Sequence, residues 1–83
     1  MPFIKKNISM KDQKHREAGR KLLNQLKERA KTKGITELQI AEKTGFNQPN
    51  VSRMFAGNFM PTLENFISLA DAVEVEITMK LKD

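Results

Sequence analysis

The stretch TELQIAEKTGFNQPNVSRMFAG, residues 36–57, decides the fold of this chain. Its apolar residues recur at the three- and four-residue spacings of two short helices, and Gly45 separates the two segments. Glycine adopts a positive φ without a steric penalty, so Gly45 predicts a tight turn. Ala41 is small enough to let the second helix cross closely above the first. We expect a compact helix pair whose inward-facing residues are Ile40, Ala41, Phe46, Val51 and Met54.

Polar side chains remain for the outer surface of the second predicted helix, namely Gln48, Asn50, Ser52 and Arg53. Proteins use amide and guanidinium groups on an exposed helix to read base edges in the major groove. Because the helix pair and the polar row occur together, the sequence predicts a helix-turn-helix that binds double-stranded DNA.

Composition argues against several other classes of protein, among them disulfide-bonded proteins, metalloproteins, enzymes and membrane proteins. The chain has 83 residues, enough for one domain. It has no cysteine, which excludes disulfides and thiolate metal sites, and its one histidine, His15, is a poor basis for a zinc site. No nucleophile–base pair or phosphate-cradling glycine loop can be assembled, so we expect no enzymatic activity, metal or cofactor. No apolar run could span a bilayer, and we expect a cytoplasmic protein without membrane contact.

Charge is distributed unevenly along the chain. Residues 1–33 contain eleven Lys and Arg against three Asp and Glu, a net charge of +8, whereas residues 34–83 contain four against seven, a net charge of −3. A basic first segment beside an acidic remainder suits a polyanionic partner on one side of the molecule. A solvated, lysine-rich helix face gives the same pattern, so the charge supports DNA binding only together with the helix pair.

Two further helices are predicted around the pair. Residues 11–33 carry apolar residues at helical spacing and end at Gly34 after a basic last turn. Pro61 and Thr62 start a helix that continues to Val73. The predicted core then consists of Leu22, Leu23, Leu26, Ile40, Val51, Met54, Leu63, Phe66, Ile67, Ala70 and Val73.

Local signals predict the ends of the two central helices. Thr36 is the expected N-cap of the first, and Gln39 three residues later completes a capping box. Asn47 is the expected N-cap of the second, where Pro49 occupies a first-turn position that needs no N–H. Gly57 is expected to end that helix.

The C-terminal residues change to a two-residue period, in which Val73, Val75, Ile77, Met79 and Leu81 alternate with polar residues. This pattern predicts a β-strand, and a single strand needs a partner for its backbone groups. The partner is either the FIKKNI segment at residues 3–8, or a copy of the tail or of that arm in another subunit. We favour pairing across a two-fold axis, which makes the tail a dimerisation element. The expected organisation is an arm at 1–10, a DNA-binding domain at 11–73 and a C-terminal strand at 74–83.

From Ile35 to about Val75 the chain resembles, without gaps, the Cro/CI-type (XRE-like) helix-turn-helix family of phage repressors and bacterial regulators. The matching features are the T-x-x-x-(L/I)-A motif at 36–41, the turn glycine, the recognition stretch at 47–53, and the Pro-Thr-Leu-Glu at 61–64. The resemblance implies a mainly α, lambda-repressor-like DNA-binding domain of four helices, here followed by a C-terminal β-strand. It also implies transcriptional regulation, and we expect a homodimeric repressor.

The resemblance also implies which residues contact DNA. Gln48 can bond adenine through both faces of its amide, and Arg53 can reach guanine O6 and N7. Asn47 also suits the N-cap, which needs only its side-chain oxygen, and we favour that role. Arg53 could instead pair with a local carboxylate. The expected base-reading residues are Asn47, Gln48, Pro49 and Arg53, and the expected phosphate-binding residues are Lys33, Thr36, Lys43, Asn50, Ser52 and Asn58.

Several positions depart from the family pattern. Glu37 replaces the usual glutamine that bonds a phosphate, and Phe55 replaces a glutamate that pairs with a first-helix arginine. Pro49 can offer only an apolar contact, for example to a thymine methyl group. The usually basic loop after Gly57 reads Asn-Phe-Met at 58–60. We therefore expect the arm and first helix to supply much of the phosphate attraction.

Two alternatives stay open. Compact chains with a helix-turn-helix and a terminal strand resemble antitoxins, in which case the face around Phe55, Phe59 and Met60, or the strand edge, holds a toxin. The other alternative is a protein-interaction module that keeps the fold without DNA affinity, because fold alone does not fix function. Glu37, Phe55 and the uncharged loop favour it.

Overall fold

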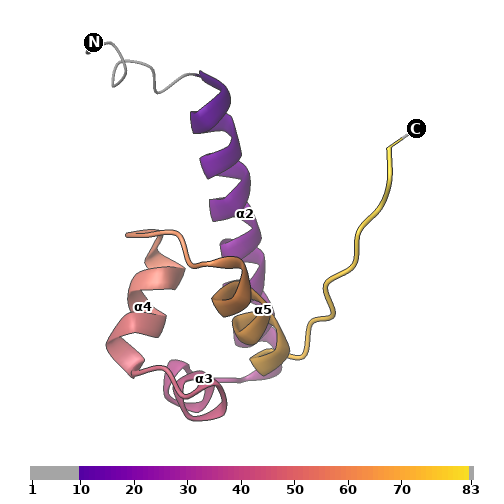
Figure 1. Ribbon diagram of the computed structural model, residues 1–83. Helices are drawn as coiled ribbons and strands as arrows, with labels where there is room; N and C mark the ends of the chain where they lie inside the picture. The colour runs from indigo at the N-terminus through magenta and orange to yellow at the C-terminus, as the bar shows by residue number, and fades with distance from the viewer. Residues whose placement is uncertain (1–9, 83) are drawn as a thin grey trace.

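The computed structural model describes residues 10–82, with side chains from residue 13 onward. This part of the chain contains four α-helices, shown in Figure 1: α2 (Met10–Lys33), α3 (Glu37–Thr44), α4 (Gln48–Ala56) and α5 (Leu63–Ala72). α4 packs against α3, α3 also packs against α5, and α2 contacts both α4 and α5. The mainly helical fold predicted from the sequence is therefore confirmed. Residues 1–9 of the predicted arm lie outside the described residues, and Met10 belongs to α2. None of the described helices combines the length and apolar character needed to cross a membrane.

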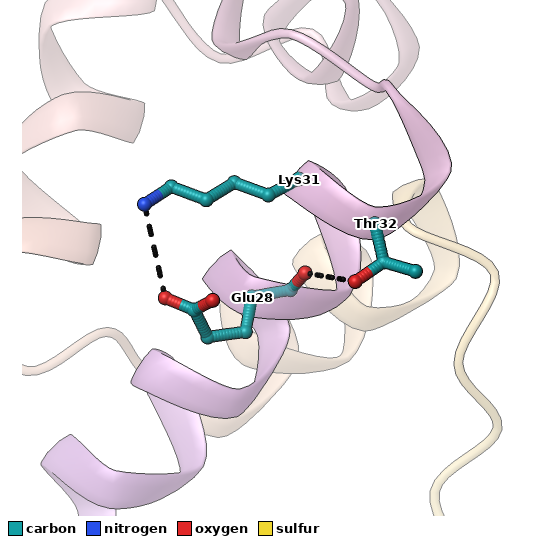
Figure 2. Close-up of polar contacts among 3 residues, drawn as sticks. All are labelled: Glu28, Lys31 and Thr32. Carbon is teal, nitrogen blue, oxygen red and sulfur yellow. Dashed lines mark hydrogen bonds and ion pairs between the residues drawn. The ribbon is translucent and has the colours of Figure 1, made fainter.

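The first helix ends where the sequence predicts. Gly34 has a φ of 71°, and the Ile35 N–H donates to the Ala30 carbonyl oxygen at 2.8 Å. This arrangement satisfies a carbonyl that would otherwise be left open at the helix end. The solvent side of the last turns is polar: Lys31 Nζ lies 3.8 Å from Glu28 Oε2, and the Thr32 hydroxyl donates to the Glu28 carbonyl (Figure 2).

The central helix pair has the predicted caps and turn. The Thr36 hydroxyl oxygen accepts from the Gln39 N–H at 3.1 Å, and the Gln39 side chain accepts from the Thr36 N–H at 2.9 Å, which completes the capping box. Gly45 has a φ of 84°, and its N–H donates to the Ala41 carbonyl. Gly57 ends α4 with a φ of 80°. The left-handed conformation of Gly45 ends α3 and turns the chain toward α4, and that of Gly57 ends α4.

The core lies where the four helices meet. The side chains of Leu23, Ile40, Val51, Leu69 and Val73 are almost fully buried at its centre. Around them, the core is completed by Leu26, Ala30, Ala41, Met54, Phe55, Ala70 and Ala72. The described residues bury no polar or charged side chain. The helices are therefore held mainly by apolar burial, the dominant favourable term in folding.

The predicted core is wrong at three positions, because Leu22, Leu63 and Ile67 are exposed. The apolar face of α5 is instead formed by Phe66, Leu69, Ala70 and Val73, at the spacings of one helical stripe. Adjacent residues of a helix point roughly 100° apart, so Ile67 is turned away from the Phe66 side. Phe55 was expected on the surface but is only 8% exposed.

The C-terminal strand predicted from the alternating pattern is not formed among the described residues. α5 ends with Glu74 at a φ of 63°, and the Val75 N–H donates to the Ala70 carbonyl at 2.8 Å. After Val75 the chain runs as an extended tail (Figure 1). Residues 75–78 border a groove with residues of α2 and α5, and the end of the tail stands away from the helices (Figure 1). The physical reason is that a strand requires hydrogen bonds from a second strand, and residues 10–82 provide none.

The core assignment predicts a contrast between two leucines of α5. Leu69→Ala should lower the free energy of unfolding by about 2–5 kcal/mol, because it removes a buried side chain and leaves a cavity. Leu63 is 74% exposed, and Leu63→Ala should change the free energy by less than about 0.5 kcal/mol. Urea unfolding of both variants, with the midpoint and slope compared, tests the assignment. Equal destabilisation at the two positions would contradict it.

Candidate nucleic-acid interface

The N-terminal end of α4 presents polar groups to solvent. Asn47 is the N-cap: its side-chain oxygen accepts from the Asn50 N–H at 2.8 Å, so the predicted capping role is confirmed. Gln48 and Pro49 follow as exposed residues, and the first turn carries no acidic side chain. The Asn50 N–H is capped and Pro49 has no N–H, and the Gln48 N–H has no backbone acceptor among residues 10–82. The helix dipole makes the site positive.

Arg53 lies one turn further along the same helix and is oriented by a neighbour. Its Nη1 donates to the Asn50 side-chain oxygen at 2.9 Å. The predicted alternative, a pair with a local carboxylate, is not what the structure shows. Because Asn50 uses its oxygen for this bond, its NH₂ group can still donate outward. The guanidinium has five N–H donors, so several stay available to a ligand.

A bond between the two central helices involves a predicted phosphate-binding residue. The Ser52 hydroxyl donates to Glu37 Oε1 at 2.6 Å, which joins the middle of α4 to the first turn of α3. Both residues are half-buried. Ser52 therefore uses its one hydroxyl proton inside the protein, and Glu37 gains a donor for its charge. Sequence reasoning missed this contact, because it joins residues fifteen positions apart.

The first turn of α3 lies beside this contact. Thr36 uses its hydroxyl oxygen and its backbone N–H in the capping box, as described above. Its hydroxyl proton has no acceptor among residues 10–82, so it can be donated outward. Glu37 adds a negative charge to the same turn. At this end of α3 a phosphate would be attracted by the Thr36 hydroxyl and repelled by the Glu37 carboxylate.

Lys33 and Lys43, two predicted phosphate contacts, are directed to the C-terminal end of α5 instead of to α4. Lys33 Nζ lies 3.0 Å from Glu74 Oε1, and Lys43 Nζ donates to the Ala72 carbonyl oxygen at 3.5 Å. The hydrogen bond from Lys33, and then the charge of that lysine, lowers the pKa of Glu74. Slight desolvation opposes the shift, and the charges of Lys43 and Arg29 add smaller effects. Cations at the negative end of a helix dipole are stabilising.

Two arginines of α2 lie beside the uncharged loop after α4. Arg16 and Arg20 line a hollow together with residues 57–60. A β-carbon at Gly57 would lie 3.6 Å from Arg20 Nε, so this side chain rests on the C-terminal end of α4. Asn58, a predicted phosphate contact, borders the same hollow and is exposed. Sequence reasoning did not single out these arginines, although their spacing of four places them on one face of α2.

The structure therefore separates the predicted residues into three groups. Asn47, Gln48, Pro49, Asn50 and Arg53 lie along the exposed side of α4, with Thr36 and Ser52 at the contact with α3. Asn58 lies at the other end of α4, beside Arg16 and Arg20. Lys33 and Lys43 lie by the end of α5. Within the part of the chain that the structure describes, no three His, Asp or Glu residues are grouped so that they could hold a metal ion.

Comparison with protein families identifies a helix-turn-helix. The family model for the helix-turn-helix covers residues 26–79, which include the end of α2 and all of α3, α4 and α5. No curated protein and no solved structure gives a significant match to the chain. The matched range contains the α4 residues and the Ser52–Glu37 contact.

The Lys33–Glu74 pair predicts a measurable titration. The carboxyl of Glu74 should titrate below an ordinary glutamate, and Lys33→Met should raise its pKa toward the ordinary value, because the main cause of the shift is removed. Stabilisation from this pair is present above the unfolded-state pKa and is lost as the pH falls through the folded pKa. NMR titration of the side chain measures the effect. Lys31→Met, which removes a lysine paired with Glu28, is the matched control, and an equal shift there would contradict the assignment.

Proposed function

The chain belongs to the Cro/CI-type helix-turn-helix family of DNA-binding regulators, and we propose that it is a homodimeric transcriptional repressor that reads the major groove with α4. The observation that carries this proposal is the two-sided character of α4. Its inner face is buried through Val51, Met54 and Phe55, while its outer face carries exposed Gln48 and an Arg53 that is already oriented. A rigid helix that holds amide and guanidinium donors outward is suited to base recognition.

The proposed base contacts follow from the chemistry of each side chain. Gln48 bonds adenine N6 and N7, and Arg53 bonds guanine O6 and N7. Pro49 contacts a thymine methyl group. Asn47 uses its side-chain oxygen to cap α4. It therefore approaches the bases only through its side-chain NH₂ group. Asn50 holds Arg53 through its oxygen, so it contributes to recognition by fixing the direction of the guanidinium.

The proposed phosphate contacts lie at both ends of α4. Thr36 donates through its hydroxyl, Asn50 through its NH₂ group, and Asn58 from the loop. Ser52 can donate only if its hydroxyl leaves Glu37, and Lys33 and Lys43 must leave their contacts at α5. Arg16 and Arg20 are better placed to add charge, because they lie beside the loop that lacks its own. Charge from α2 thus takes the place of the basic loop typical of the family.

Repression by a homodimer follows as part of the proposal. Two copies related by a two-fold axis would place their α4 helices in successive major grooves, about 34 Å apart along the duplex. The operator is then a palindrome of two half-sites. Binding DNA as a regulator also implies a cytoplasmic location.

The antitoxin alternative loses support at one of its two expected toxin-binding surfaces, the face around Phe55, Phe59 and Met60. Of the three residues proposed to form a toxin-binding face, Phe55 is buried. Met60 lies against α2, since a β-carbon at Gly19 would be 2.9 Å from its sulfur. Phe59 and Met60 remain partly exposed and form a smaller surface than expected. The regulator is therefore the function that the geometry supports best.

Base reading by Arg53 can be tested by selection from a random duplex pool. The unmodified protein should enrich a palindrome, and Arg53→Ala should lose preference at the guanine positions, because each bidentate contact is worth about 1–3 kcal/mol. Arg29→Ala, which removes an exposed arginine of α2, should enrich the same palindrome as the unmodified protein. An unchanged sequence preference for Arg53→Ala would show that this residue does not read bases.

Phosphate attraction by the α2 arginines predicts a change in salt dependence. Arg20→Gln should reduce the slope of log K against log salt by about 0.9 for each phosphate that the variant no longer neutralises, without changing the preferred sequence. Lys31→Gln removes the same charge from a lysine that pairs with Glu28 and should leave the slope unchanged. Fluorescence anisotropy over a salt series gives both slopes. If the two variants behave alike, the hollow beside Asn58 is not a phosphate site.

A further inference from the structure

The C-terminal tail has a charge pattern that is complementary to itself. Residues 74–82 read EVEITMKLK, with acidic residues before Thr78 and basic residues after it at matching distances. The residues between them are Val75, Ile77, Met79 and Leu81. In an extended chain successive side chains point to opposite faces, so one face is polar and the other is apolar. The helix-turn-helix itself makes no use of this pattern.

We infer that the tails of two copies pair as an antiparallel β-ribbon whose two-fold axis passes through Thr78. In this register Glu76 lies opposite Lys80 of the second copy, and the same pair forms again on the other side of the axis. Ile77 lies opposite Met79, and Val75 lies opposite Leu81. Directly opposed residues of unlike charge stabilise an antiparallel pair, and like charges destabilise it.

Charge and polarity distinguish this register from two other arrangements. A parallel, in-register pair would place Glu76 on Glu76 and Lys80 on Lys80, which is unfavourable. An antiparallel register displaced by one residue would bring polar side chains opposite apolar ones and mix the two faces of the ribbon. Of these three arrangements, the antiparallel one centred on Thr78 is the one that pairs unlike charges and keeps the two faces separate.

The structure places the tail where such a ribbon can be covered. A groove lies between the tail and the helices, lined by Leu22, Gln25, Leu26 and Phe66 on one side and by residues 75–78 on the other. Val75 and Ile77 belong to the apolar face of the tail and border this groove. In the ribbon, Met79 and Leu81 of the second copy come beside them. Both residues are almost fully exposed in the single chain, at 89% and 87%, and pairing would remove them from water.

The start of the ribbon is set by the end of α5. Glu74 has a left-handed backbone and its carboxylate is bonded to Lys33, so it does not continue the strand. Val75 is the first residue that can pair, and its N–H already bonds Ala70. Residues 76–82 form no backbone hydrogen bond with other described residues. Their N–H and C=O groups are thus available to a second strand.

This inference rests on the homodimer in the proposed function and specifies its contact. Because the chain contains no cysteine, single cysteines report the register directly. Thr78→Cys should form a disulfide-linked dimer under mild oxidation, since residue 78 faces its own copy, and directly opposed β-carbons lie about 4.5–5.5 Å apart. Glu76→Cys and Lys80→Cys should each fail to cross-link alone, because each lies four residues, about 13 Å, from its own copy along the ribbon. An equimolar mixture of these two variants should give the cross-linked heterodimer.

The outcomes separate the alternatives. Equal cross-linking at positions 76, 78 and 80 would show parallel pairing, and no cross-linking at any of them would show that the tail does not pair with itself. Either result overturns the inference. Non-specific duplex binding at low salt is measured on the same variants. Loss of duplex binding with the cross-link intact would count against the proposed function and leave the ribbon standing.

Charge reversal provides a second test that adds no cysteine. Glu76→Lys should weaken the dimer by roughly tenfold in Kd, because it sets two lysines opposite each other twice in the ribbon. The double variant Glu76→Lys with Lys80→Glu restores unlike pairs and should recover the Kd of the unmodified chain. Sedimentation equilibrium measures all three constants. A double variant as weak as the single one would contradict the register.

Discussion

The close packing of α4 on α3 is the constraint on which the rest of the structure depends. Ile40 and Val51 are fully buried at this contact, and Gly45 provides the turn that brings the two helices together. With the inner face of α4 fixed by apolar contacts, its outer face is held rigidly at a defined angle to the body. Recognition of base edges requires such rigidity, because a misplaced donor loses its bond. The fold thus serves chiefly to position one surface.

Polar groups around this surface are arranged to orient one another. Asn50 directs Arg53, while Glu37 holds Ser52 and carries a charge that would repel a nearby phosphate. If α4 reads DNA as proposed, this negative charge would favour release of the duplex, and Arg16 and Arg20 of α2, beside the loop that follows α4, would oppose that release. In the proposed function, affinity and selectivity come from different elements: α2 would supply attraction without sequence information, and α4 would supply discrimination.

Features that depend on a few neighbouring residues could be predicted from the sequence. The capping box at Thr36 and the turn at Gly45 are examples, because their partners lie within a turn of the chain. Apolar contacts between α3 and α4 could also be predicted, because the spacing of Ile40 and Val51 marks the inner faces of the two helices. The Ser52–Glu37 bond and the burial of Phe55 could not be predicted, because they depend on how the helices cross. The tail shows a third case: its alternation indicates a strand, but strand formation requires a partner that residues 10–82 of one chain do not supply.

The most direct test of the central claim is an NMR titration of the isotope-labelled protein with its selected duplex at low salt. If α4 reads the major groove, the largest shift changes will fall on the side-chain amides of Gln48 and Asn50 and on the guanidinium of Arg53, with smaller changes beside Asn58. If the chemical shifts of these groups do not change when the duplex binds, the protein binds DNA through another surface and the proposed role of α4 is wrong.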